Sequence, residues 1–233
     1  MRDLEDHYWW FVSRRRLALS LMAPKTHQDA KVLDLGCGTG ALSTELAANY
    51  DVVSLDFSSE ALAFCQERGL KNLVHADAQV LPFPDASFDV VVSLDTLEHI
   101  PDDSAAVREA FRALKPGGTF IVNVPAYRWL WGPHDVALMH HRRYTKAQLL
   151  SLLRSQGFAV SWASYSVFFL FPIVLVIRAL DKLKKGPPEV RLPTLPRWMN
   201  TALTVLQDVE SAILRRAPLP WGSSVVAIAK KTD

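Results

Sequence analysis

The sequence is poor in cysteine, in net charge and in long apolar runs. Its 2 cysteines, Cys37 and Cys65, cannot build a disulfide framework, and neither has the CxxC or CxxH neighbour of a zinc site. Lys and Arg number 26 against 24 Asp and Glu, a net charge of +2, so no global field draws the chain to nucleic acid. The N-terminus has no apolar stretch of signal-peptide length. These absences predict a chain of the reducing cytoplasm with no nucleic-acid partner.

The composition is that of a folded domain. Hydrophobic residues make up 49% and charged residues 21% of the 233 residues, which excludes a disordered chain, and the length suits one domain with an elaboration. Between residues 31 and 124, short apolar runs alternate with segments of helical period. This alternation predicts an α/β fold with a doubly wound, parallel sheet covered on both faces. Expected strands span 31–35, 51–57, 72–77, 88–95, 118–124, 158–166 and 223–231, and expected helices span 41–50, 59–69, 103–118, 146–157 and 197–216.

A glycine-rich turn follows the first expected strand. Gly36 and Gly38 stand between that strand and a helix, where glycine permits positive φ and lets backbone amides approach a ligand closely. With Ala41 they also fit the dinucleotide pattern G-x-G-x-x-G/A, so the turn alone leaves a nicotinamide cofactor open. Asp34 would repel a pyrophosphate but attract a ligand that carries ammonium and sulfonium groups. Asp56, at the end of the second strand, suits ribose hydroxyls in either ligand.

Four stretches of the sequence carry a resemblance to a known family. Residues 32–40, 75–100 and 114–125, together with Asp56, resemble class I S-adenosylmethionine-dependent methyltransferases of the broad type-11 group, which includes enzymes similar to those of ubiquinone and menaquinone biosynthesis. The resemblance implies S-adenosyl-L-methionine as cofactor. It also implies a mostly parallel, seven-stranded Rossmann-like sheet with a helical insertion between the last two strands.

The resemblance assigns roles by position. It implies that the cofactor contacts Arg16 (or its neighbours Arg14 and Arg15), Asp34, Gly36, Cys37, Gly38, Asp56, Phe57, Asp77, Ala78, Ser93, Leu94 and Asp95. The expected domain organisation is an N-terminal helical lid over residues 1–30, a core of 31–166 and 218–233, and a helical insertion of 167–217. The aromatic residues 8–11 either close over the cofactor as part of that lid or pack into the core.

Two clusters could supply the chemistry at the acceptor. Asp95, Glu98 and His99 fall at i, i+3 and i+4, a set that suits a divalent ion. Ubiquinone-biosynthesis O-methyltransferases carry a similar ExxEH that binds metal, but LEHI is frequent in the whole group without metal. We therefore expect no metal here, and His99 as a pocket residue or general base.

The second cluster is the segment 125–146, called the acceptor loop below. It follows the carboxyl end of a strand and should overhang the cofactor. His140 and His141 join His99 as candidate catalytic bases. Candidate substrate-binding residues are Trp131, His134, Asp135, Arg142, Arg143 and Tyr144. The arginines indicate an anionic acceptor, and the alternative is a structural loop that Asp135 and the arginines tie to the sheet.

The insertion, residues 167–217, has features of a segment that contacts a membrane. Residues 167–177 are 11 uncharged residues, too few for the roughly 20 of a spanning helix. Residues 178–197 carry 6 Lys or Arg against 2 Asp or Glu. An apolar helix beside basic residues is typical of contact with an anionic membrane surface. A homodimer interface and a lid over an apolar acceptor are the alternatives.

The resulting hypothesis is methyl transfer from S-adenosylmethionine to an oxygen or nitrogen of a small acceptor, either anionic or lipid-linked. The chain is then expected in the cytoplasm or on the inner face of the membrane. An NAD(P)-dependent oxidoreductase and an inactive cofactor-binding partner protein are the alternatives. Asp34 and the lack of a Tyr/Lys or Cys catalytic pattern argue against the first of these.

Overall fold

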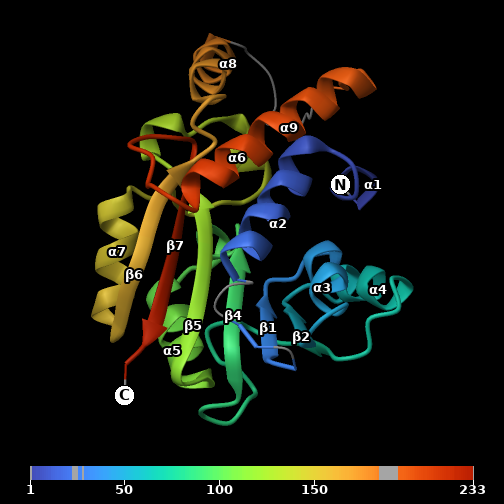
Figure 1. Ribbon diagram of the computed structural model, residues 1–233, viewed down its shortest axis with the longest axis vertical. Coiled ribbons are helices and arrows are strands. Elements are labelled where there is room, and N and C mark those ends of the chain that lie inside the picture. The colour runs from blue at the N-terminus through green and yellow to red at the C-terminus, as the bar shows by residue number, and fades with distance from the viewer. Residues whose placement is uncertain (1, 23–25, 28, 184–193, 233) are drawn as a thin grey trace.

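The computed structural model describes residues 2–22, 26–27, 29–183 and 194–232 (Figure 1). Its centre is a seven-stranded sheet in the order β3-β2-β1-β4-β5-β7-β6. All pairings are parallel except those of β7, which runs antiparallel to both β5 and β6. The strands are β1 (Lys31–Leu35), β2 (Asp51–Asp56), β3 (Leu73–His75), β4 (Phe88–Leu94), β5 (Leu114–Pro125), β6 (Phe158–Ser166) and β7 (Ser224–Lys231). The predicted α/β sheet is confirmed.

Helices cover both faces of this sheet and its upper edge (Figure 1). They are α1 (Arg2–Glu5), α2 (Trp9–Met22), α3 (Ala41–Leu46), α4 (Ser59–Glu67), α5 (Asp103–Ala113), α6 (Pro133–Ala137), α7 (Lys146–Ser155), α8 (Phe171–Leu183) and α9 (Arg197–Leu214), with 3-10 turns η2 (Leu97–His99) and η3 (Arg128–Leu130). The helical insertion between the last two strands is confirmed as α8 and α9. No helix in the described part of the chain is long and apolar enough to cross a membrane.

The apolar strands divide their side chains between two cores. Leu33, Val91 and Phe120 point to one face, in a core that also holds Leu149 of α7. Their sequence neighbours, among them Val32, Val90 and Ile121, point to the other face, in a core that includes Leu42 and Leu46 of α3 and Met22 of α2. Because successive strand residues face opposite sides, a sheet buried on both faces needs nearly continuous apolar runs.

The predicted helix 103–118 ends earlier than expected, at Ala113. Pro116 lacks an amide hydrogen and Gly117 has φ of 73°, so neither suits a helix. Residues from Leu114 onward instead begin β5.

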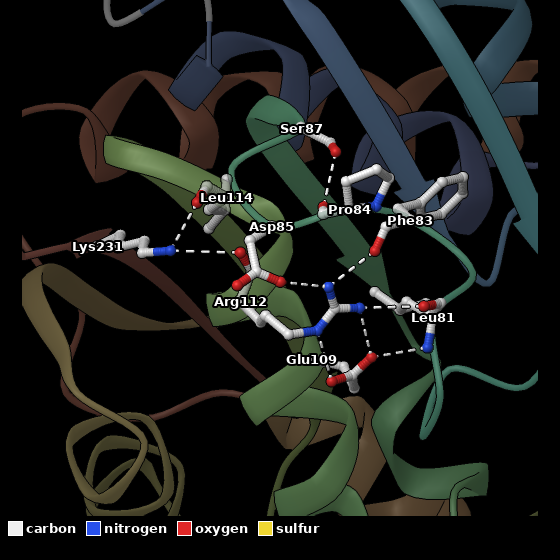
Figure 2. Close-up of polar contacts among 9 residues, drawn as sticks. All are labelled: Leu81, Phe83, Pro84, Asp85, Ser87, Glu109, Arg112, Leu114 and Lys231. Atoms are coloured by element: carbon white, nitrogen blue, oxygen red, sulfur yellow. Dashed lines mark hydrogen bonds and ion pairs between the residues drawn. The ribbon is translucent and has the colours of Figure 1, made fainter.

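Arg112, near the end of α5, fixes the segment that leads into β4 (Figure 2). Its guanidinium donates to the carbonyl oxygens of Phe83 at 2.7 Å and Leu81 at 3.0 Å, and pairs with Asp85 at 2.7 Å. Glu109, one turn earlier, accepts from the Leu81 amide at 2.8 Å. The segment between β3 and β4 has no helix or strand of its own, and these contacts with α5 fix its position.

Helices α2 and α9 lie side by side over the sheet edge (Figure 1). Leu17 and Leu21 of α2 are buried with Leu214 of α9 and with Val226 and Ile228 of β7. The N-terminal segment is therefore packed into the domain through α2. Whether it acts as a lid stays a prediction.

Candidate functional site

The glycine turn, Gly36 to Gly40, leaves the carboxyl end of β1. Gly36 and Gly38 have φ of 80° and 54°, which glycine adopts without the strain of a side chain. The Gly38 amide donates to Asp56 Oδ2 at 2.8 Å, so the acid at the end of β2 is tied directly to the turn. A Cβ on Gly36 would lie 2.2 Å from the Thr96 side chain, whereas one on Gly38 would meet nothing within 4 Å. Gly38 is the open position of the turn.

Asp34 lies beneath this turn and has a different partner from the one expected. Its side chain is only 2% exposed, and Oδ2 accepts a 2.6 Å hydrogen bond from the Ser43 hydroxyl, which in turn accepts from Ser54. Burial raises the pKa of Asp34 to about 7. In this structure Asp34 is therefore a buried group that supports the turn from below, and its role toward a cationic ligand stays a prediction.

The other predicted cofactor residues lie at the ends of β1, β2, β3 and β4. Phe57 is 75% exposed, while Cys37 and Ala78 are buried. Asp77 accepts from the amide of Gln79 at 2.8 Å, and Leu94 is half-buried. Ser93 is fully buried, and its hydroxyl has no hydrogen-bond partner within the described residues.

Arg16 does not reach this site. Its guanidinium pairs with Asp208 of α9 at 2.6 Å on the surface. Arg14 is the member of the triplet that reaches the end of β4: it stacks 4.4 Å from the Trp10 ring and forms an ion pair with Asp95. Two residues along a helix rotate a side chain by about 200°, so Arg14 and Arg16 must face opposite sides.

Asp95 also accepts from Asn123 Nδ2 at 3.0 Å, so the end of β4 is linked to β5. Sequence reasoning missed Asn123, and the available signal was a single amide side chain within the apolar run of β5.

The 3-10 turn η2 brings Glu98 and His99 against the acceptor loop. The amide of His141 donates to the Glu98 carbonyl oxygen at 2.7 Å, and the His99 and His140 rings meet edge to face with centroids 4.6 Å apart. Burial lowers the pKa of His99 to about 4 and raises that of Glu98 to about 8. Near neutral pH, the site therefore holds a neutral imidazole beside a protonated carboxyl group.

Glu98, His99 and His140 also form a potential metal-binding group, with ligand atoms within 4.8 Å of one another. Oε2 of Glu98 is buried without a hydrogen-bond partner in the described structure. Two imidazoles and a carboxylate are a donor set that suits a divalent transition metal. Asp95, which the sequence analysis grouped with Glu98 and His99, is not a member of this group and pairs with Arg14 instead. The expectation of no metal stays a prediction.

Asp135 organises the acceptor loop from its centre. It is 0% exposed and accepts from the Gly132 amide at 2.9 Å, His140 Nδ1 at 2.9 Å and Arg143 Nε at 2.7 Å. Burial alone would raise the pKa of Asp135, but these donors hold it well below its usual range. Since an ionised carboxylate only accepts, His140 carries its proton on Nδ1 and leaves Nε2 free to take another.

Arg142, Arg143 and Tyr144 are engaged within the protein. Arg142 pairs with Asp103 at 2.7 Å, and Tyr144 donates to the same carboxylate at 2.7 Å. Arg143 donates to the Ala126 carbonyl oxygen at 3.0 Å in addition to Asp135. These are the contacts expected of the alternative, a loop that Asp135 and the arginines tie to the sheet. A substrate-binding role for Arg142 and Arg143 stays a prediction.

The remaining loop residues divide between surface and interior. His141 is exposed and Trp131 half-buried. Burial, together with the charge of Arg178, lowers the pKa of His134 to about 4. Arg178 of α8 lies over the same loop, since a Cβ on Gly132 would stand 3.1 Å from its guanidinium. Helix α8 therefore borders the predicted acceptor region.

Comparisons with known proteins agree on one family. Residues 33–122 match a family model described as a methyltransferase domain. A probable S-adenosylmethionine-dependent methyltransferase of Mycolicibacterium smegmatis is 34% identical over 161 residues, 67% of this chain and 61% of that protein. The chain thus spans about three-fifths of that relative's length. A ubiquinone biosynthesis O-methyltransferase of Xanthomonas oryzae pv. oryzae is 37% identical over 101 residues, 40% of this chain and 42% of that one.

A solved structure extends the likeness of fold to the whole chain. The complex between the Haloferax volcanii Trm112 methyltransferase activator and a putative methyltransferase matches with a TM-score of 0.66 and 21% identity, covering 100% of this chain and 93% of the other.

Proposed function

Because the chain belongs to the type-11 group of class I S-adenosylmethionine-dependent methyltransferases, we propose that it moves a methyl group from S-adenosylmethionine to an oxygen or nitrogen of an acceptor under the acceptor loop. The observation that carries the proposal is the open Gly38, tied to Asp56 at the sheet edge from which the acceptor loop leaves, with His140 held through Nδ1 by Asp135. An NAD(P)-dependent oxidoreductase and an inactive partner protein are not favoured by the comparisons.

The bound cofactor would supply an electrophilic methyl group, and the chain's residues would bind the cofactor, accept a proton and position the acceptor. Asp56 accepts hydrogen bonds from the ribose hydroxyls, and Phe57 offers an exposed ring to the adenine. His140 Nε2 takes the proton from the acceptor, while Asp135 holds the ring and stabilises its charged form. Much of the rate comes from holding acceptor and methyl group in line, which suits a loop fixed by buried hydrogen bonds.

The acceptor, in this proposal, is lipid-linked, and α8 is where the lipid lies. Ile173, Val176, Ile177 and Leu180 are 55%, 59%, 48% and 52% exposed, at the i, i+3, i+4 and i+7 spacing of one helix face. This face belongs to the helix that borders the acceptor loop through Arg178. The pairing of Arg142 and Arg143 removes the support for an anionic acceptor.

Titration calorimetry with S-adenosylhomocysteine, beside NADH, tests the cofactor half. We expect micromolar binding of S-adenosylhomocysteine and none of NADH, and the reverse result would refute the proposal. Transfer of a radiolabelled methyl group to lipid-linked and water-soluble acceptors, with and without EDTA, then tests the reaction and a metal at Glu98, His99 and His140.

Co-sedimentation with anionic vesicles tests the lipid contact. We expect Ile177→Glu to abolish vesicle binding. The matched control is Val80→Glu, which changes a side chain that is 73% exposed in the segment between β3 and β4. Equal binding by both variants, or a dimer that Ile177→Glu dissociates, contradicts the membrane proposal and favours a homodimer interface through residues 167–217.

A further inference from the structure

The chain's two cysteines meet beneath the glycine turn. Cys37, inside the turn, and Cys65, on α4, are both buried free thiols with their sulfur atoms 3.8 Å apart. They lie 28 positions apart in the sequence, so the contact could not be predicted from their spacing. Since a disulfide requires a sulfur separation of about 2.0 Å, the two sulfurs are within about 1.8 Å of bonding distance.

Helix α4 holds this turn through side chains that reach its carbonyl groups. The Cys65 thiol donates to the Gly38 carbonyl oxygen at 3.3 Å, and Arg68 donates to that of Thr39 at 2.8 Å. A Cβ on Gly40 would stand only 2.8 Å from the Cys65 sulfur. The cysteine pair therefore sits where a small displacement changes the backbone of the turn.

We propose that Cys37 and Cys65 are an oxidative modification site, at which a hydroperoxide closes a disulfide that weakens cofactor binding. One thiolate attacks the peroxide oxygen and becomes a sulfenic acid, and the second thiol attacks that sulfur as water leaves. In total, two thiols and one hydrogen peroxide give one disulfide and two waters. The hydrogen bond between the thiols raises the pKa of Cys37, which burial raises further, and lowers the pKa of Cys65. Cys65 is therefore the thiol of the pair that ionises first and attacks the peroxide.

Closing the bond has two consequences for the turn. It consumes the S–H donor that now serves the Gly38 carbonyl oxygen. It also pulls Cys37 toward α4, while the Cys37 amide is bonded to Leu55 O at 3.0 Å and the Gly38 amide to Asp56 at 2.8 Å. The turn cannot move toward α4 and keep both hydrogen bonds at their present lengths. This consequence rests on the proposed function, whereas disulfide formation does not.

The experiment treats the purified full chain with hydrogen peroxide and measures intact mass, free thiols and affinity for S-adenosylhomocysteine. We expect a loss of 2 Da (about two hydrogens) and of both thiols, an affinity at least about tenfold weaker, and recovery with dithiothreitol. Cys65→Ser, which keeps a hydroxyl donor near Gly38 and cannot form the bond, should bind equally before and after peroxide.

Each other outcome has one meaning. Mass gains of whole oxygen atoms with no disulfide, an unchanged affinity in the disulfide form, or an equal loss in Cys65→Ser would each overturn the inference. Absence of binding in the reduced wild-type protein would instead refute the proposed cofactor. In that case intact mass alone decides whether the two sulfurs bond.

Discussion

The glycine turn and the acceptor loop lie at the same edge of the sheet, but different contacts hold them. The turn is fixed mainly by near neighbours in the fold: the amides of Gly36 and Cys37 donate to Leu55 of the adjacent strand β2. The acceptor loop is fixed by a buried carboxylate, Asp135, that binds an amide, an imidazole and a guanidinium. The turn is held by several backbone amides and side chains at once, whereas the acceptor loop depends on one buried charged side chain.

Removing the charge at Asp135 is expected to give the largest effect. Asp135→Asn leaves Arg143, 9% exposed, without its anionic partner, and breaking a buried pair in this way costs about 3–5 kcal/mol. It also replaces a carboxylate that can only accept with an amide that also donates, so the proton of His140 is no longer confined to Nδ1. We expect this loss of stability in chemical denaturation, and at least about a hundredfold loss of methyl transfer.

Asp103→Asn is the matched control, because Asp103 pairs with the partly exposed Arg142 rather than with a histidine. It should cost about 1 kcal/mol and leave turnover within about threefold of wild type. If Asp135→Asn is no worse than this control, the loop does not depend on its buried charge.

The two glycines test the turn in the same way. Gly36→Ala places a methyl group 2.2 Å from Thr96, so we expect a loss of several kcal/mol or failure to fold. Gly38→Ala meets no neighbour and should cost only the roughly 1 kcal/mol of an alanine at positive φ. Its affinity for S-adenosylhomocysteine should nevertheless fall at least about tenfold. Unchanged affinity in a folded Gly38→Ala would show that this open position does not face the cofactor.

Glu210 of α9 is a buried carboxylate in the insertion that, like Asp135, binds several donors. It is 1% exposed and accepts from the amides of Val167, Phe168 and Phe169, so one side chain of α9 holds the chain where it leaves β6 for α8. Glu210→Gln keeps the size but replaces one acceptor oxygen with a donor. We expect about 2 kcal/mol of destabilisation in urea, with cofactor affinity unchanged. A smaller cost than that of Asp103→Asn would contradict this role.

These contrasts explain what the sequence could and could not predict. The strands and the turn were predictable because β1, β4 and β5 are apolar on both faces and Gly36 and Gly38 mark the break between strand and helix. The partners of Asp34 and Glu210 were not, since a charged residue in a sequence looks the same whether it binds a ligand or a distant amide. For Asp135 the sequence left two roles open, substrate binding and a tie to the arginines of its own loop. The position of Arg16 was hard to predict for a simpler reason. The rotation of α2 about its axis decides which arginine of the triplet reaches the end of β4, and here it is Arg14.

A further expected effect concerns Asp34 and appears as a pH dependence. Burial raises its pKa from 3.8 to about 7, so the folded protein keeps a proton that the unfolded chain releases at lower pH. The contribution of Asp34 to stability is therefore complete below about pH 4 and is lost as pH rises to about 7. Asp34→Asn imitates the protonated form and should remove this loss, which is on the order of 4 kcal/mol for a fully buried carboxyl with this shift. Subtracting the variant's denaturation free energy from that of wild type, pH by pH, cancels the opposing contributions of His99 and His134. A difference that is constant from pH 4 to pH 8 would mean that Asp34 ionises normally and is free to meet a cationic ligand, as the sequence alone suggested.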